Sequence, residues 1–287
     1  MWHNLLPHDK VTIFYIIVTV IITIAGSSCL ENVPEHLLVK SAMFFFIIII
    51  TLMHKKWQNL SVSIIHNFYP LFFLGYFYAE TGYLNNLILN DLDPFIKHYE
   101  QLLFGCQPSI EFSKLFPQTW FNELMNFGYF SYYFLTVTVC LTIFIVRPKE
   151  YQFTIFIIIT SFFIYYIIFI IFPVIGPQFY FPAPLSKIPD AGFFRDGVKF
   201  AQHIGEQPTG AFPSSHVGMA LIFLYISYNN YRKLFLLILP FVIILFFATV
   251  YIKAHYLVDV IGGFVSSPLV LFISIKMYKL FYKHEKA

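Results

Sequence analysis

The chain has 287 residues, of which 58% are hydrophobic and only 11% are charged. Its mean hydropathy of +0.70 excludes an ordinary soluble domain and predicts a protein solvated by lipid. The formal net charge of +3 is too small, and the basic residues are too dispersed, to predict a nucleic-acid partner.

Eight apolar stretches predict membrane helices, because a bilayer core takes roughly 20 residues of helix. They cover residues 11–30, 37–53, 62–79, 121–146, 152–175, 214–229, 234–252 and 257–277. The second stretch is short and begins near Lys40. If it does not fully cross the membrane, a total of six or seven membrane-spanning helices remains possible. The sequence therefore predicts an all-α, polytopic membrane helix bundle of about eight transmembrane helices. With no internal repeat, residues 1–287 are interpreted as a single integral membrane domain.

Lys and Arg indicate how this multi-pass protein lies in its membrane. The short connections after the second, fourth and sixth stretches are basic, with Lys55, Lys56, Arg147, Arg232 and Lys233. We therefore expect these connections and both termini to be cytoplasmic. The two long connections, at about 80–120 and 176–213, then lie on the periplasmic or lumenal face. The first has apolar residues at helical spacing, which predicts an interfacial amphipathic helix that either roofs a site or merely packs on the bundle.

Residues 209–218 run directly from the second long connection into an apolar stretch. Pro213 followed by Ser214 and Ser215 is a good helix start, and the N–H groups of a first helical turn can hold an anion. His216 stands at that positive helix end. An ionisable group beside hydrocarbon needs a reason to be there. The alternative is a capped helix that places His216 at the interface with no further role.

A second polar segment contains His255, followed four residues later by Asp259. On a helix these positions face the same way, so Asp259 can accept a hydrogen bond from the His255 ring. That bond selects one tautomer and leaves the other ring nitrogen available to attack an electrophile. The spacing alone is a weak signal, because chance produces it often.

Topology brings the two segments together. Between His216 and His255 the chain crosses the membrane and returns, so both histidines emerge on the face that carries Lys187, Arg195 and Lys199. A histidine nucleophile with its carboxylate, a second histidine as acid and a helix amino terminus form a phosphoryl-transfer site. The predicted catalytic residues are His255, Asp259 and His216, and no metal site is predicted. The predicted substrate-binding residues are Ser214, Ser215, Gly218, Gln178, Tyr180, Arg195 and Lys253.

The runs Pro-Ser-Ser-His at 213–216 and His-Tyr-Leu-Val-Asp at 255–259 resemble the second and third signature motifs of the type 2 phosphatidic acid phosphatase superfamily. The resemblance implies a six-helix core over about 60–275, two N-terminal helices over about 1–58, and an enzyme without a metal or other cofactor. It also implies that His255 attacks phosphorus to form a phosphohistidine, that Asp259 orients it, and that His216 protonates the leaving oxygen.

Departures from the phosphatase motifs bear on the substrate. Ala248 and Thr249 stand where that branch has Ser-Arg, and Cys140 stands where its first motif has Lys ahead of Arg-Pro. The cationic clamp of a monoester phosphatase is therefore missing. Residues 172–180 and the Asp-Pro at 93–94 resemble instead the inositol phosphorylceramide synthase-like, or sphingolipid synthase-like, branch. This resemblance implies transfer of a phosphodiester head group, which carries one negative charge where a monoester carries nearly two.

Three functions stay open. The first is a lipid head-group phosphotransferase whose partners are membrane lipids, as donor and as acceptor alcohol. The second is a lipid phosphate or polyprenyl diphosphate phosphatase that uses the same site, with Lys253, Arg195 or another loop cation in place of the clamp. The third is a non-enzymatic transporter or channel, although transport sites usually lie near the bilayer midplane. The head group, the acceptor, the membrane and the oligomeric state stay open as well.

Overall fold

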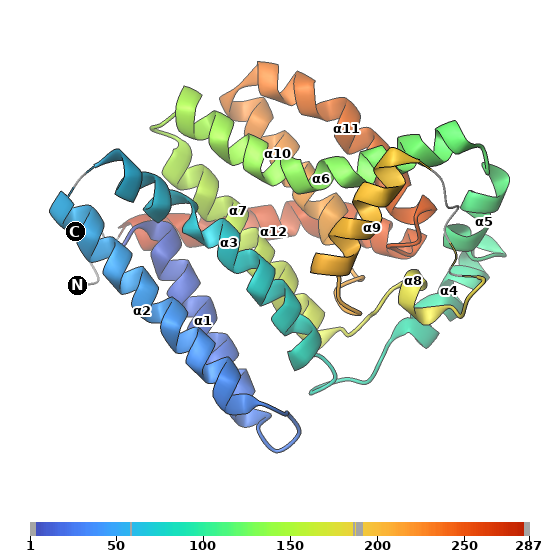
Figure 1. Cartoon of the computed structure of the whole chain (residues 1–287), viewed down its shortest axis with the longest axis horizontal. Helices are drawn as coiled ribbons and strands as arrows, with labels where there is room; N and C mark the ends of the chain where they lie inside the picture. Colours follow the sequence, from blue (N-terminus) through green and yellow to red (C-terminus); the bar gives the residue numbers. More distant parts are fainter. Residues whose placement is uncertain (1–3, 58, 186, 188–191, 284–287) are drawn as a thin grey trace.

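The computed structural model describes residues 4–57, 59–185, 187 and 192–283, and every regular element in these ranges is helical (Figure 1). The long helices are α1 (Pro7–Ala25), α2 (Val33–Trp57), α3 (Leu60–Leu84), α6 (Thr119–Val146), α7 (Tyr151–Ile171), α10 (Ser215–Asn230), α11 (Arg232–Tyr251) and α12 (Leu257–Lys283). The short helices are α4 (Asp93–Phe104), α5 (Pro108–Leu115), α8 (Pro177–Tyr180) and α9 (Phe193–Gly205). The prediction of an all-α bundle is confirmed.

Each of the eight predicted stretches falls on one long helix. Within the described residues, seven of these helices are long and apolar enough to cross a membrane. The eighth, α10, has 16 residues and is therefore about 24 Å long, but it packs within the bundle against α6, α7, α11 and α12. Helix α2 extends over 25 residues, so the second stretch is long enough to cross.

Helix α7 lies at the centre of the bundle, in contact with α1, α3, α6, α10 and α12. Its sequence is apolar on every side, as expected of a helix surrounded by other helices, and 78% of its apolar window is buried. Helix α2, by contrast, buries only 22% of its window and packs on α1 and α3 at the edge of the bundle (Figure 1). The large apolar side chains that α2 exposes, such as Leu38 and Phe45, are what a multi-pass membrane protein presents to lipid.

The first long connection folds into α4 and α5 rather than into one helix. Helix α4 buries two acidic residues, Asp93 and Glu100, and exposes Phe95, Leu102 and Leu103. Its apolar side therefore faces outward, as expected of a helix in the membrane interface. The second long connection contains α8 and α9, which the hydropathy pattern did not predict, and α9 packs along α6.

Backbone hydrogen bonds join the two long connections to the turn between α11 and α12. The N–H of Leu92 donates to Pro173 O at 2.9 Å, and that of Ala211 donates to Val174 O at 3.0 Å. The N–H of Gln178 donates to Lys253 O, also at 3.0 Å. These bonds hold the two long connections and the turn before α12 together.

Candidate active site

Helix α10 begins at Ser215 with Ser214 as its N-cap, as predicted from Pro213-Ser214-Ser215. The Ser214 side chain accepts a hydrogen bond from the N–H of Val217, and the Ser214 N–H donates to Asp259 O at 2.9 Å. His216 is the second residue of the helix, where backbone N–H groups have no acceptor within the helix. Its ring is therefore placed beside a positive helix end.

His255 lies in the bend before α12, which begins at Leu257. The expectation that His255 and Asp259 share one helical face is therefore wrong, because only Asp259 is helical. Asp259 Oδ2 accepts a 2.7 Å hydrogen bond from the N–H of Tyr256 and lies 3.5 Å from His255 Nδ1. The Asp259 carboxyl group therefore lies close to the ring, although its short hydrogen bond is made with the backbone.

The His255 ring donates its short hydrogen bond to a backbone carbonyl, since its Nδ1 lies 2.8 Å from Ala211 O. A carbonyl oxygen only accepts hydrogen bonds, so Nδ1 carries the proton and Nε2 carries the lone pair. That Nε2 lies 3.0 Å from His216 Nδ1, which must then be the donor. The two histidines predicted to act together are thus directly hydrogen-bonded.

Burial lowers the pKa of His255 to about 4, against a smaller opposing effect of its hydrogen bond to Ala211. The side chain is only 3% exposed, so its charged form loses most of its hydration. At neutral pH the ring is uncharged. A neutral imidazole with a directed lone pair is the form that can act as a nucleophile.

A narrow pocket opens beside the two imidazoles. Its lining includes the predicted residues His216, His255, Ser215 and Gln178. The remaining lining residues are Tyr78, Tyr129, Ile175, Phe179, Glu206, Gln207, Thr209, Gly210, Ala211 and Ala254. The lining therefore contains one carboxylate and no Lys or Arg in the part of the chain that the structure describes.

Glu206 is a pocket residue that sequence reasoning missed. Its carboxylate accepts hydrogen bonds from Gln178 Nε2 at 2.6 Å, from Gln202 Nε2 at 3.1 Å, and from the Tyr129 hydroxyl. Tyr133 OH adds a longer bond of 3.4 Å. These donors come from α6, α8 and α9, so no local sequence signal connects them.

The predicted cations Arg195 and Lys253 do not line the pocket. Lys253 Nζ donates to Ser113 Oγ at 3.0 Å and to Lys187 O at 2.9 Å, which turns it toward α5. Burial lowers the pKa of Lys253 to about 8, with further lowering by the nearby charges of Lys114 and Arg195. The backbone of Arg195 is held by Glu123, whose Oε1 accepts its N–H at 3.0 Å.

Two other predicted binding residues also lie off the pocket. A Cβ at Gly218 would meet the Tyr165 hydroxyl at 1.8 Å, so this glycine permits the close approach of α10 to α7. The Tyr180 ring packs against Phe181, with the Lys97 ammonium 5.8 Å from its centroid.

Helix α4 holds the segments that carry the site. Asp93 accepts hydrogen bonds from the N–H groups of Ile175 and Gly176, at 2.7 and 2.9 Å, and from the Tyr256 hydroxyl at 2.9 Å. Glu100 accepts the N–H of Leu257 at 2.6 Å, in the first turn of α12. The pKa of Asp93 and the pKa of Glu100 are each raised to about 7, and burial is the main cause in both cases.

The chain was compared with families of known proteins. A family model described as the PAP2 superfamily matches residues 95–273, which is more than half of the chain and extends from α4 into α12. The matched segment includes His216, His255, Asp259 and Glu206. Comparisons with curated proteins and with solved structures gave no match.

Proposed function

The chain belongs to the PAP2 superfamily, and from this premise we propose that it is a lipid head-group phosphotransferase that works through a phosphohistidine. The superfamily supports a phosphatase or phosphotransferase acting on lipids. The observation that carries the proposal is the 3.0 Å contact between His216 Nδ1 and His255 Nε2. This contact places the lone pair of His255 Nε2 and the Nδ1 proton of His216 beside the same pocket.

In the first step the lone pair of His255 Nε2 attacks phosphorus of the donor phosphodiester, and the bond from phosphorus to the glycerol oxygen breaks. Burial lowers the pKa of His216, and the anionic phosphodiester beside the ring would favour its imidazolium form against that effect. This imidazolium gives its Nδ1 proton to the leaving oxygen. The His255 ring becomes cationic as it is phosphorylated, and the carbonyl of Ala211 and the carboxylate of Asp259 stabilise it.

In the second step the acceptor alcohol attacks the phosphohistidine. Neutral His216 takes the hydroxyl proton, the bond from phosphorus to His255 Nε2 breaks, and the ring returns to its starting state. Water in place of the alcohol would give hydrolysis. The site chemistry is thus shared with a phosphatase, and selection of the acceptor decides the reaction.

The charge of the pocket favours a diester over a monoester. No cation stands among its described lining residues, and Glu206 adds a negative charge. A carboxylate repels a dianionic monoester more strongly than a monoanionic diester. The lining therefore supports the sphingolipid synthase-like proposal, in which both donor and acceptor are membrane lipids and no metal takes part.

We place this reaction on the periplasmic or lumenal face, with both termini cytoplasmic. The support is the distribution of basic residues in the short connections opposite the site, such as Arg147, Arg232 and Lys233.

The proposal is tested by incubating the purified protein with a phosphodiester lipid labelled in its head group and a lipid alcohol. We expect the label to move to the alcohol, diacylglycerol to form, chelator to have no effect, and the His255→Gln variant to be inactive. Release of inorganic phosphate from a phosphomonoester lipid, without any head-group exchange, would instead establish the phosphatase.

A further inference from the structure

A second cluster of ionisable residues lies away from the catalytic pocket, where α1 begins. His8 and Asp9 in α1 and His66 in α3 have exposed fractions of 0%, 0% and 1%. Along α3, Thr81 contacts Thr209 near the catalytic pocket, and fifteen residues, or roughly 22 Å of helix, separate Thr81 from His66. The cluster therefore lies toward the other end of the bundle, and the phosphotransfer mechanism has no use for it.

The donor atoms of the cluster converge. One atom from each of the three side chains can be chosen so that all lie within 4.8 Å of one another. His66 Nε2 lies 2.9 Å from Asp9 Oδ2, and His8 Nε2 lies 3.5 Å from Asp9 Oδ1. Two imidazole nitrogens and a carboxylate are a common ligand set for first-row divalent transition metals.

Surrounding groups orient these donors as a second shell does in metal sites. Asp9 accepts hydrogen bonds from the Tyr69 hydroxyl and from the N–H of Leu6, both at 2.8 Å. The Nδ1 of His66 lies 2.6 Å from His54 Nδ1 in α2. The Asp9 carboxylate only accepts hydrogen bonds, so His66 Nε2 donates to it at 2.9 Å. Moving the His66 proton to Nδ1, where it can be donated to His54, would free the lone pair of Nε2 for a cation.

The second histidine is held by the backbone: His8 Nε2 lies 3.1 Å from the carbonyl oxygen of His66. That oxygen only accepts hydrogen bonds, so a metal on Nε2 would replace this bond. His8 Nδ1 and Gln152 Oε1 are both buried with no hydrogen-bond partner among the described residues. A metal on Nε2 places the His8 proton on Nδ1, where it can be donated to Gln152 in α7. Metal binding would thus exchange the hydrogen bond of His8 to the His66 carbonyl for one between His8 Nδ1 and Gln152 Oε1.

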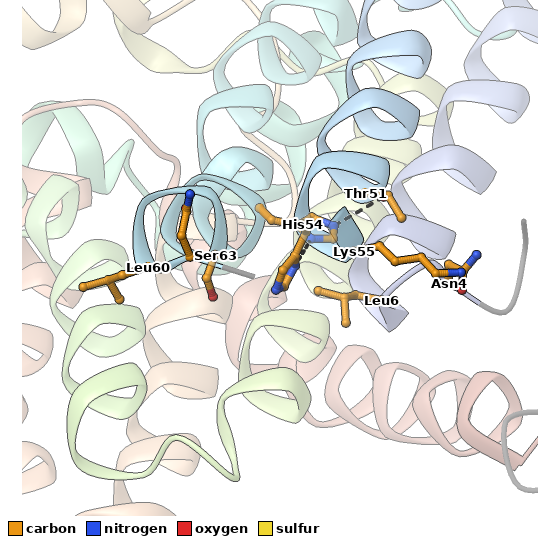
Figure 2. Close-up of a pocket in the computed structure, with 9 residues that line it drawn as sticks. Asn4, Leu6, Thr51, His54, Lys55, Leu60 and Ser63 are labelled. Carbon is orange, nitrogen blue, oxygen red and sulfur yellow. Dashed lines mark hydrogen bonds between the residues drawn. The ribbon is translucent and has the colours of Figure 1, made fainter. Parts of the chain in front are cut away.

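A pocket of about 600 Å³ leads to the cluster, lined by His66, Thr51, His54 and Lys55 among others (Figure 2). His54, Lys55 and Ser63 surround this opening in the close-up (Figure 2). His66 is the member of the cluster that lines this pocket, so a cation would approach the cluster from the His66 side.

We propose that His8 Nε2, the Asp9 carboxylate and His66 Nε2 bind a divalent transition metal of the zinc type. The metal links α1 to α3, with α2 attached through His54, and so holds the N-terminal helices on the bundle. Two imidazole ligands disfavour Mg²⁺ and Ca²⁺, which prefer oxygen donors. The site is separate from the catalytic histidines, so it is compatible with a phosphotransfer step that needs no metal.

The test is titration of the chelator-treated full-length protein with Co²⁺, followed by displacement with Zn²⁺. We expect one equivalent to bind with ligand-field absorption, and Zn²⁺ to raise the melting temperature. Asp9→Asn and His66→Gln should weaken binding by at least about 10-fold. His98→Gln, at an exposed position of α4, is the matched control and should bind as the wild type does.

The His255→Gln variant separates this site from the catalytic pair. If it retains one equivalent of metal, the N-terminal cluster is supported, and X-ray absorption on its Zn²⁺ complex should show imidazole scattering with nitrogen or oxygen ligands at about 2.0–2.2 Å. This measurement also covers the case in which Asp9→Asn or His66→Gln fails to fold. Binding that disappears in His255→Gln, or no stoichiometric binding by the wild type, would overturn the proposal and leave a hydrogen-bonded proton network.

Discussion

His216 Nδ1 donates its hydrogen bond to His255 Nε2 across 3.0 Å, so the proposed acid is already directed at the proposed nucleophile. When phosphorus bonds to Nε2, that contact is replaced and the His216 proton becomes available to the leaving oxygen. The roles proposed for the two rings therefore differ, and their substitution should have different consequences.

Substitution of His255 should abolish formation of the phosphoenzyme. We expect His255→Gln to lower turnover by about 10³-fold or more, because no other nucleophile faces the pocket from that turn. Acid-labile labelling of the protein by a donor radiolabelled at phosphorus is the measurement. Continued labelling in this variant would place the nucleophile elsewhere.

Substitution of His216 should depend on the leaving group. A general acid contributes about 10²–10⁴-fold when the leaving oxygen is basic, and less when it is already stable as an anion. We expect His216→Gln to impair a lipid alkoxide leaving group far more than a nitrophenolate, measured as kcat/KM on paired phosphodiesters. Equal losses for both substrates would contradict the assigned role.

The pH profile should reflect the buried state of His255. Its pKa of about 4 lies below the ordinary value of 6.5, so the lone pair is lost only as the pH falls through about 4. We expect no loss of kcat/KM between pH 7 and about 5, because His255 keeps its lone pair over that range. An acidic limb near 6.5 would instead indicate a hydrated histidine. Measurement on the free enzyme at low substrate concentration reports this group.

Glu206 should set the preference between substrate charges. Replacing its carboxylate by an amide removes a negative charge from the pocket, which helps a dianion more than a monoanion. We expect Glu206→Gln to raise the ratio of kcat/KM for a phosphomonoester over that for a phosphodiester. Glu123→Gln is the matched control, because Glu123 binds the backbone of Phe194 and Arg195 and does not line the pocket. An unchanged ratio in Glu206→Gln would exclude this selection.

Asp93 should matter more for stability than its partner Tyr256. Asp93→Ala leaves two backbone N–H groups and one hydroxyl without their acceptor, and each such group costs about 1–3 kcal/mol. Tyr256→Phe removes only one bond, worth about 1 kcal/mol. We expect a clearly larger fall in apparent melting temperature for Asp93→Ala. Equal shifts would show that the two backbone bonds contribute little.

Glu100 should make stability depend on pH. Its pKa of about 7 in the folded chain exceeds the ordinary value of 4.5, so the folded state holds this proton more tightly than the unfolded state. The resulting stability is complete below about pH 4.5, decreases as the pH rises to about 7, and is absent above that. We expect Glu100→Gln to show a smaller decrease across this window than the wild type. Parallel melting curves in both proteins would argue against it.

Much of the fold and part of the site followed from the sequence alone. The eight apolar stretches predicted the eight long helices, because the length and composition of a membrane helix are dictated by the bilayer. The helix start at Ser214 and Ser215 is a local capping signal. The proximity of His216 and His255 followed from counting crossings, which needs no knowledge of side-chain positions.

The tertiary structure decided which groups surround those two rings. Ala211 accepts the His255 proton from 44 residues away, Glu206 reaches the pocket through donors on α6, α8 and α9, and Lys253 turns toward α5. The cluster of His8, Asp9 and His66 likewise joins positions 57 residues apart. Such contacts depend on how irregular segments pack against distant helices. Periodicity and local motifs carry no information about that packing, because they describe only neighbours along the chain.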